Sequence, residues 1–311
     1  MGGWMWGGVD ETEAIRAIHA ALEEGINLID TAPVYGYGRS EELIGRAISD
    51  RREKVVLATK CGLVWQREAG QFFFNSDDAG LNPTGPRKVF RYLGATSIRE
   101  ELEQSLQRLG TDYVDLYQTH WQDATTPIAE TMEELLKLKS EGKIRAIGVC
   151  NATPTQMEEY HAIGPLDTDQ EKYSLLDREL DQDHLPYCEK QGIAVLAYSP
   201  LALGLLTGKI DAGRKFGPGD LRQDNPRFSP ENLAKVAVFM ADLRPIAEGR
   251  RLTLTQLVVA WTVTRPGLTH ALVGARDVRQ ARENAAAGRA QLAVEDLEAI
   301  ATAVQKHALS I

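Results

Sequence analysis

The sequence predicts an α/β protein folded as a (β/α)8 TIM barrel. Short apolar runs typical of strands alternate with segments of helical periodicity, and this alternation indicates a parallel sheet with helical crossovers. No Gly-x-Gly-x-x-Gly follows the first of these strands, so the fingerprint of a doubly wound dinucleotide-binding fold is missing. The length of 311 residues suits one barrel, and we expect residues 1–311 to form a single domain.

Continuous apolar runs, as found in strands that are covered on both faces, predict the strands of the barrel. They cover residues 27–30, 55–59, 113–118, 144–149, 193–198 and 271–273, and the polar segment 168–172 is a weaker candidate for a seventh strand. This count is one short of eight. The first strand should therefore precede residue 1 or be concealed in the Gly- and Trp-rich segment 1–8.

Apolar side chains at helical spacing predict the helices between these strands. They cover residues 10–24, 40–48, 97–109, 127–141, 153–163, 183–191, 231–249, 255–264, 278–287 and 294–307. Ser40 and Ser97 are expected to open two of them, and Thr153-Pro154 reads as a cap followed by a first-turn proline. Two long segments, 61–96 and 201–230, are rich in Gly and Pro and read as functional loops.

Composition excludes several classes of partner. The net charge is -9 with no basic cluster, so nucleic acid is not expected, and no apolar run approaches the ~20 residues of a membrane helix. The cysteines Cys61, Cys150 and Cys188 form neither a disulfide framework nor a metal-ligand spacing. We therefore expect no bound metal, no membrane association and a reducing cytoplasmic location.

Chemistry-bearing residues follow successive strands at the carboxyl ends, where barrels of this kind hold their active sites. Asp30, Lys60, His120 and Asn151 end or follow four strands, and Tyr35 lies five residues beyond Asp30. Taken singly, each has a simpler structural role as a cap, a solvated charge or a packed side chain. Because they meet at one rim of the inferred barrel, a catalytic cluster is a credible alternative, although the pattern alone does not name the reaction.

The same segments carry a resemblance to a known family. They are residues 28–36 (LIDTAPVYG), 40–45 (SEELIG), 58–60 (ATK), 109–120 (LGTDYVDLYQTH), 142–151 (GKIRAIGVCN), 198–201 (YSPL) and 274–276 (GAR) with Gln280, Glu283 and Asn284. In this order and over nearly the whole chain, the sequence resembles the aldo-keto reductase family. It is most similar to the bacterial branch of general stress proteins and glyceraldehyde-type reductases.

The resemblance implies a catalytic tetrad of Asp30, Tyr35, Lys60 and His120. Tyr35 would donate a proton to a carbonyl oxygen, and the Lys60 ammonium would lower the phenol pKa from its ordinary value of about 10. Asp30 would keep Lys60 charged and oriented, and His120 would hydrogen-bond the carbonyl. The activity implied is the reversible reduction of small aldehydes and ketones, with the hydride supplied by NADPH.

The resemblance also implies how the cofactor would be held. Asn151 and Gln170 would hold the nicotinamide carboxamide, and Tyr198 would stack on the ring. The remaining contacts implied are those of Ser199, Leu201, Gly204 and Lys209 around the pyrophosphate, of Arg276 after Gly274 with the 2′-phosphate, and of Gln280 and Asn284 with the adenine. Glu283 would either bond the adenine or orient Arg276. The planar guanidinium suits a phosphate, which favours NADPH over NADH.

Aromatic residues are expected to form the substrate pocket. Trp4, Trp6, Trp65 and Trp121, with Tyr35 and His120, suit a small carbonyl compound or a sugar-like aldehyde. For each tryptophan, ordinary core packing is the alternative.

The sequence departs from the family at its start, because members open with a β-hairpin and the first barrel strand. Without these elements, we expect a gap or irregular pairing between the strands at 27–30 and 271–273.

Two other functions compete with a carbonyl reductase. One is a non-catalytic NADPH-binding subunit, like the channel-associated members of the family, against which the intact tetrad argues. The other is an unrelated barrel hydrolase that uses two carboxylates. It would need a second acid beside Asp30, and the candidates Glu41 and Glu42 look like the first turn of a helix.

Overall fold

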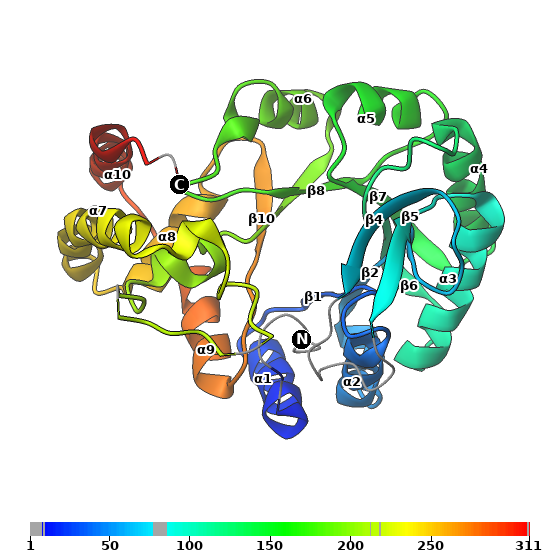
Figure 1. Ribbon diagram of the computed structural model, residues 1–311, viewed down its shortest axis with the longest axis horizontal. Coiled ribbons are helices and arrows are strands. Elements are labelled where there is room, and N and C mark those ends of the chain that lie inside the picture. Colours follow the sequence, from blue (N-terminus) through cyan, green and yellow to red (C-terminus); the bar gives the residue numbers. More distant parts are fainter. Residues whose placement is uncertain (1–7, 9, 77–85, 212, 218, 310) are drawn as a thin grey trace.

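Seven parallel strands form the central sheet of the part of the chain that the structure describes, and helices line its outer side (Figure 1). The computed structural model describes residues 8, 10–76, 86–211, 213–217, 219–309 and 311. In sheet order the strands are β1 (Leu28–Asp30), β2 (Val56–Cys61), β6 (Val114–Thr119), β7 (Ile144–Cys150), β8 (Thr168–Lys172), β9 (Ala194–Tyr198) and β10 (Leu268–Leu272). The strand-and-helix alternation predicted a parallel barrel, and this prediction is confirmed.

Helices follow the strands as the crossovers of such a barrel require. They are α1 (Glu11–Glu23), α2 (Arg39–Ile48), α3 (Ala95–Leu109), α4 (Ile128–Ser140), α5 (Pro154–His161), α6 (His184–Gln191), α7 (Pro230–Gly249), α8 (Leu254–Val263), α9 (Val278–Ala287) and α10 (Val294–His307). Short 3-10 turns are η1 (Arg52–Lys54), η2 (Glu179–Asp181), η3 (Ala202–Thr207) and η4 (Pro226–Phe228). The expected cap at Thr153 is present as a reciprocal capping box with Gln156.

Two helices begin earlier than their serines suggested. The N-cap of α2 is Gly38, whose φ of 99° is left-handed, and Ser40 lies inside the helix, where its hydroxyl accepts a hydrogen bond from Thr31. The N-cap of α3 is Gly94, and Ser97 lies in the first turn, where its hydroxyl donates to Glu101. Both serines are buried; the Ser40 hydroxyl joins α2 to the loop after β1, and the Ser97 hydroxyl bonds to the next turn of its own helix.

The ring of strands is not closed within the described residues. There β1 pairs with β2 alone and β10 with β9 alone, so the predicted gap between the strands at 27–30 and 271–273 is confirmed. The layer of helices does continue across this gap, because α1 and α9 pack side by side (Figure 1). Small side chains, including Ala17, Ala20 and Ala281, form that contact.

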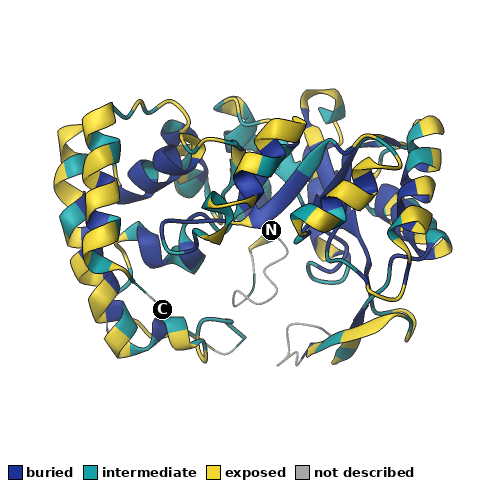
Figure 2. Cartoon of the chain, turned by 90° about the horizontal axis from the view of Figure 1, so that it is seen from above, coloured by how far each residue is buried: buried dark blue, intermediate teal, exposed yellow. Residues whose placement is uncertain are grey.

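The segment at 61–96 was predicted to be a loop, and this prediction is wrong for its described residues. It forms a second, three-stranded antiparallel sheet in the order β3 (Leu63–Val64), β5 (Arg87–Arg91) and β4 (Gln71–Ser76). Figure 2 shows β4 and β5 projecting from the body of the barrel. The segment at 201–230 is closer to expectation, since η3 and η4 are its only helical turns among the described residues.

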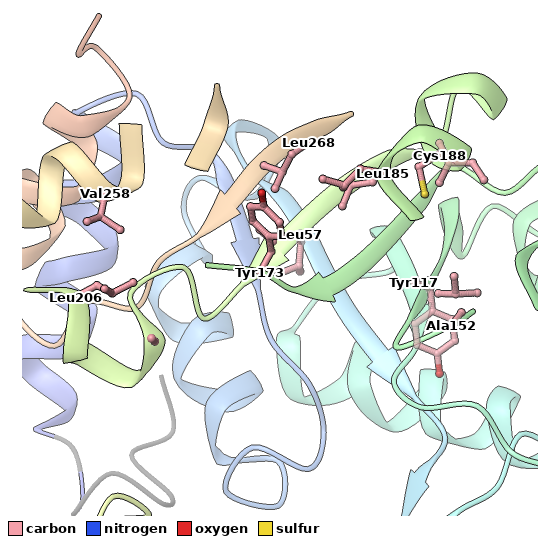
Figure 3. Close-up of a cluster of buried hydrophobic side chains, with 14 of the residues drawn as sticks. Leu57, Tyr117, Ala152, Tyr173, Leu185, Cys188, Leu206, Val258 and Leu268 are labelled. Carbon is pink, nitrogen blue, oxygen red and sulfur yellow. The ribbon is translucent and has the colours of Figure 1, made fainter. Parts of the chain in front are cut away.

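The main core lies between the outer face of the sheet and the helices (Figures 2 and 3). Leu57 and Tyr117 point into it from neighbouring strands, and both are fully buried. All three cysteines are buried free thiols, as expected of core or loop residues. No helix in the described part of the chain is long and apolar enough to cross a membrane.

Candidate active site

The register of the parallel strands brings the predicted polar residues to one end of the barrel interior. Asp30 aligns with Ala58, and Lys60, two residues further along β2, aligns with Gln118 of β6. Alternate residues of a strand share a face, so Lys60 points inward like Ala58, which belongs to a small apolar cluster with Leu116. This apolar layer forms the floor beneath the polar residues at the carboxyl ends of the strands.

The ammonium of Lys60 is the most deeply enclosed charge at this end. Its side chain is 0% exposed, and Nζ donates to both carboxylate oxygens of Asp30 at 2.8 and 2.7 Å and to the carbonyl of Thr31 at 2.9 Å. Burial by itself lowers the pKa of Lys60, but the Asp30 carboxylate, with smaller contributions from Tyr35 and Cys150, more than offsets this effect and the net pKa is raised. Lys60 is therefore positively charged at neutral pH.

Tyr35 lies beside this ion pair on a tight loop after β1. The backbone N–H of Tyr35 donates to Ala32 at 3.1 Å, and Gly38 N–H donates to Pro33 at 2.7 Å, so the loop folds back on itself. The Lys60 Nζ lies 5.1 Å from the centre of the Tyr35 ring, and its three N–H groups donate to Asp30 and Thr31. The lysine is thus close enough to act on the ionisation of the phenol.

The expectation that the phenol pKa is lowered needs a correction. Burial raises the pKa of Tyr35 above its ordinary value of 10.0, and the charge of Lys60 opposes this rise without reversing it. The hydroxyl of Tyr35 is therefore protonated at neutral pH, which is the state that a proton donor requires. The attraction of Lys60 for the phenolate favours the state that follows proton transfer.

His120 completes this group from the end of β6. Its backbone N–H donates to Cys61 at 2.8 Å, and its ring meets the Tyr35 ring edge to face with centres 5.6 Å apart. Burial, and then the charge of Lys60, lower the pKa of His120 well below its ordinary 6.5. A neutral imidazole can donate one hydrogen bond without adding a second charge to the site.

Three residues predicted to hold a cofactor form a hydrogen-bonded chain next to the tetrad. Asn151 donates from Nδ2 to the His120 carbonyl at 2.9 Å and accepts from the Tyr198 hydroxyl at 2.9 Å. Gln170 donates from Nε2 to Asp30 at 2.9 Å. Asn151 also has a φ of 53°, a left-handed conformation that asparagine tolerates better than most residues. These contacts fix the amide groups at the rim of the barrel.

Two adjoining cavities open over this end, one of about 690 Å³ and the other of about 750 Å³. Tyr35 and Ser199 line both, and the smaller one also contacts Asn151, Gln170 and Tyr198. Each of the other residues predicted to bind the cofactor lines the larger cavity: Leu201, Gly204, Lys209, Gly274, Arg276, Gln280, Glu283 and Asn284. The structure thus brings the predicted cofactor residues together, although their roles stay predictions.

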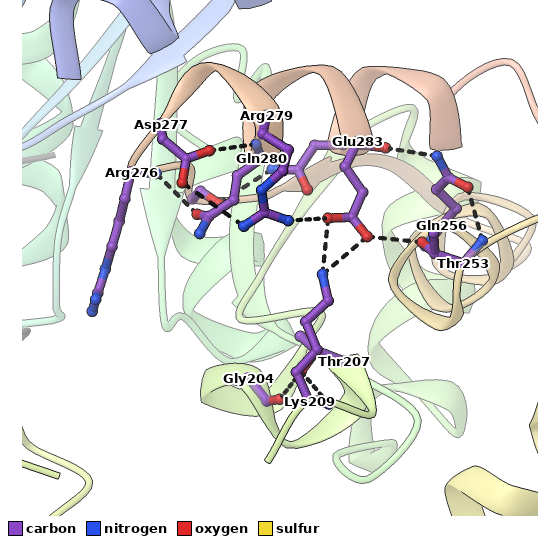
Figure 4. A network of polar contacts seen from close by, with 12 residues as sticks. Gly204, Thr207, Lys209, Thr253, Gln256, Arg276, Asp277, Arg279, Gln280 and Glu283 are labelled. Atoms are coloured by element: carbon purple, nitrogen blue, oxygen red, sulfur yellow. Dashed lines mark hydrogen bonds and ion pairs between the residues drawn. The ribbon is translucent and has the colours of Figure 1, made fainter. Parts of the chain in front are cut away.

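An ionic contact spans the larger cavity (Figure 4). Lys209, just after η3, donates to Glu283 of α9 at 2.9 Å, and Glu283 also accepts from Thr253 at 2.9 Å. Arg279 lies 3.8 Å from the same carboxylate. Glu283 therefore holds the loop after η3 and does not pair with Arg276, whose side chain points away from this network in Figure 4.

The other polar residues of α9 hold the loop that leads into it. The side chain of Gln280 accepts from the backbone N–H of Arg276 at 3.0 Å. Asn284 donates from Nδ2 to the carbonyl of Gly274 at 3.2 Å. Both side chains therefore fix the segment that carries Arg276, in addition to lining the cavity.

The expected substrate aromatics are placed only in part. Trp4 and Trp6 lie outside the described residues. Trp65 packs against Tyr37 with ring centres 5.1 Å apart, and Trp121 lines the smaller cavity together with Tyr35.

Sequence reasoning missed a contribution from the small antiparallel sheet. Phe73 of β4 packs on Trp121 at 5.2 Å between ring centres, and Arg91 of β5 stacks on both rings. A run of three phenylalanines at 72–74 was the signal for an aromatic contact here.

A buried trio away from the cavities has residue types that could ligate a metal ion. Asp169, His184 and Cys188 place their ligand atoms within 4.8 Å of one another. Asp169 is next to Gln170 on β8 and therefore points to the opposite, helix-covered side of the sheet. The His184 ring hydrogen-bonds Oδ2 of Asp169 at 2.5 Å, whereas Oδ1 of Asp169 is buried without a partner among the described residues.

Comparison with known proteins gives one consistent picture. A family model described as "Aldo/keto reductase family" matches residues 1–305. The chain is 44% identical over 291 residues to the "NADH-specific methylglyoxal reductase" of Escherichia coli strain K12, covering 92% of this chain and 86% of that protein. It is 42% identical over 279 residues to the "Aldo-keto reductase YhdN" of Bacillus subtilis strain 168, covering 89% and 78%.

Solved structures agree with this match. A glycerol dehydrogenase of Gluconobacter oxydans, AKR11B4, superposes with a TM-score of 0.87 and 42% identity, covering 98% of this chain and 89% of that chain. An aldo-keto reductase of Klebsiella pneumoniae in complex with NADPH superposes with a TM-score of 0.70 and 29% identity, covering 96% and 85%. The similarity extends over nearly the full described barrel.

Proposed function

Because the chain belongs to the aldo/keto reductase family, we propose that it reduces small aldehydes and ketones to alcohols with NADPH and that Tyr35 donates the proton. The chain is an NAD(P)H-dependent oxidoreductase that acts on carbonyl compounds.

One observation carries the assignment. A lysine with no exposed side-chain surface is held charged by two contacts to Asp30, and its Nζ lies 5.1 Å from the centre of a tyrosine ring. An isolated buried ammonium is costly, so this arrangement is hard to explain as packing alone. It favours a site in which negative charge develops on an oxygen atom close to Lys60.

The tetrad would act as follows. His120, neutral and at the cavity wall, donates a hydrogen bond to the carbonyl oxygen of the substrate and sets its direction. Tyr35 then transfers its proton to that oxygen as negative charge develops. Lys60 stabilises the phenolate that remains, and Asp30 keeps Lys60 charged throughout. Reversal of the same proton transfer would serve alcohol oxidation.

The hydrogen-bond donors that line the two cavities suit a nicotinamide dinucleotide. The larger one contains the cations Lys209 and Arg276 beside Gly204, whose φ of 100° lets the backbone take a turn closed to other residues. The smaller one presents the amides of Asn151 and Gln170 next to the tetrad. When bound, the cofactor supplies the hydride, and the protein orients cofactor and substrate and provides the electrostatic environment of the reaction.

The choice of NADPH over NADH rests on Arg276, which lines the larger cavity beside α9. A guanidinium binds a phosphate through parallel hydrogen bonds, and such a contact discriminates for a 2′-phosphate. The related reductase of Escherichia coli is named as NADH-specific, so this point calls for a direct test. We propose methylglyoxal, the substrate in that protein's name, as the first compound to assay.

The test of catalysis compares the parent protein with Tyr35→Phe. We expect the variant to lose about a hundredfold or more in kcat for methylglyoxal, because one general acid typically contributes that much. Its affinity for NADPH, followed by nicotinamide fluorescence, should stay within twofold, since phenylalanine preserves the ring. Full turnover by Tyr35→Phe would refute the assignment of the proton donor.

The test of cofactor choice compares kcat/KM for NADPH and NADH in the parent and in Arg276→Met. We expect the parent to favour NADPH and the variant to lose about tenfold or more of that preference, a charge-assisted contact being worth about 1.5–3 kcal/mol. Arg289→Met is the matched control, since Arg289 pairs with Glu24 outside both cavities. A parent that prefers NADH, or a ratio unchanged in Arg276→Met, would overturn the proposal for NADPH.

A further inference from the structure

Arg91 is a charged side chain that the tetrad and the cofactor residues leave without a role. It ends β5 and points to the same side as the buried Val89, two residues earlier. Its guanidinium carbon lies 4.1 Å from the centre of the Phe73 ring and 5.0 Å from the centre of the Trp121 ring. The charge is thus set against an aromatic wall.

The guanidinium is not neutralised there. Among the residues that the structure describes, Arg91 forms no ion pair, and its Nε is buried without a hydrogen-bond partner. Two arginines of the same region differ: Arg67 pairs with Glu100, and Arg87, which stacks on Tyr37, has a further partner. Contact with two rings stabilises a cation but leaves its N–H donors unsatisfied.

The ring on which Arg91 stacks also belongs to the active-site wall. Trp121 follows His120 directly and lines the smaller cavity together with His120 and Tyr35. Arg91 itself is not among the residues that line either cavity, so its contact with Trp121 is what joins this unpaired positive charge to the wall of the site.

We propose that Arg91 binds the carboxylate of an aldehyde substrate, so that short ω-oxo acids are preferred over neutral aldehydes of the same size. This inference rests on the proposed reductase function and specifies its substrate class. A carboxylate is planar and accepts two parallel hydrogen bonds, which matches the side-by-side Nε–H and terminal N–H of a guanidinium, and the Nε of Arg91 has no partner among the described residues. The carboxylate takes no part in the reaction.

The experiment uses two aldehydes that differ in charge, succinic semialdehyde and its methyl ester, methyl 4-oxobutanoate. The parent should show a kcat/KM about tenfold higher for the acid than for the ester. In Arg91→Met the ratio should fall to near one. In Arg91→Lys it should be intermediate, because lysine retains the charge but lacks the two parallel N–H donors of a guanidinium. Intrinsic reactivity of the two aldehydes cancels when the ratios are compared between variants.

Arg67→Met is the matched control, since it removes the same charge from an exposed site beside the small sheet. Its ratio should equal that of the parent. A parent ratio near one, or an Arg91→Met ratio as high as the parent's, would overturn the inference. So would an equal fall in Arg67→Met, because the effect would then come from net charge alone.

Two further measurements separate this inference from the proposed function and from other anions. Turnover of neutral methylglyoxal by the parent tests the reductase itself, so its absence would refute the function, whereas its presence with no acid preference would refute only the role of Arg91. Propionate, but not propionamide, should inhibit that turnover in the parent. If Arg91→Met lowers kcat/KM for glyceraldehyde 3-phosphate but not for succinic semialdehyde, a phosphate is the ligand and the carboxylate assignment fails.

Discussion

Replacing Asp30 by Asn tests the physical basis of the site, because it removes one charge with little change in shape. Lys60 would keep the carbonyl of Thr31 at 2.9 Å, while one of its two contacts at 2.7–2.8 Å would face an amide N–H instead of an oxygen. At an effective dielectric constant of about 20, two charges roughly 4 Å apart attract by about 4 kcal/mol. Breaking a buried pair on one side costs about 3–5 kcal/mol for the same reason.

We therefore expect Asp30→Asn to lower the free energy of unfolding at pH 7 by about 3–5 kcal/mol. The pKa of Lys60, raised in the parent, should fall below its ordinary 10.5 once burial acts without the carboxylate. The unfolded chain would then bind a proton that the folded variant lacks, so the variant's stability should rise with pH between the lowered pKa and 10.5. In the parent, this residue gives no such rise.

The assay is urea unfolding of parent and variant at pH 7, 8 and 9, followed by far-ultraviolet circular dichroism. The stability difference should shrink with pH, by at most about 1.4 kcal/mol per pH unit. The kcat for methylglyoxal should fall about a hundredfold or more at pH 7, since the phenolate loses its counter-charge. A variant with parental stability, parental pH dependence and parental kcat would refute the idea that Asp30 holds Lys60 charged.

Three other expectations follow from buried or bridging charges. Burial raises the pKa of Glu101 from 4.5 to about 8, so this residue ionises at lower pH in the unfolded chain and makes stability fall between those pH values. Glu101→Gln should therefore flatten the fall in Tm from pH 5 to pH 8. An unaltered slope of Tm against pH would contradict this. Arg108→Met should lower the free energy of unfolding in urea by about 3–5 kcal/mol, because it leaves the fully buried Glu41 without its ion-pair partner. Adding Glu41→Gln should restore part of this free energy. If it restores none, the ion pair does not account for the loss. Lys209→Met should release NADPH several-fold faster in stopped-flow fluorescence, because the contact between Lys209 and Glu283 spans the cavity. An unaltered release rate would show that this contact does not retain the cofactor.

The sequence predicted the barrel and the position of the tetrad because both depend on local patterns. Asp30, Lys60 and His120 stand at the ends of clearly apolar strands, and parallel pairing brings such ends to one rim whatever the details of packing. The gap beside β1 in the described part of the chain followed from counting strands. These conclusions needed only the order of elements and a rule about where barrels keep their sites.

The small antiparallel sheet was missed because its own pattern is broken. The register of β4 against β5 shifts between Phe72 and Phe74, so the alternation that signals a strand is lost at its most apolar point. Contacts across long sequence separations were equally hidden. Glu283 was expected to serve the adenine or Arg276, but it meets Lys209, 74 residues earlier in the chain.

The direction of the Tyr35 pKa was also beyond the sequence. A neighbouring ammonium lowers a phenol pKa and burial raises it, and the two effects can be weighed only when the depth of the phenol is known. The motif identifies the partners of Tyr35 but not how much water reaches them.

The alanine contact between α1 and α9 has a consequence for how the catalytic end keeps its shape. Among the described residues, the ring of strands is interrupted beside β1, while the layer of helices is continuous where Ala17 and Ala20 meet Ala281. Ala281 also borders the smaller cavity, and α9 carries the side chains that face the larger one. Small methyl groups allow these two helices to approach closely, so a larger side chain at Ala281 would push α9, and the side chains that it carries toward the larger cavity, away from α1.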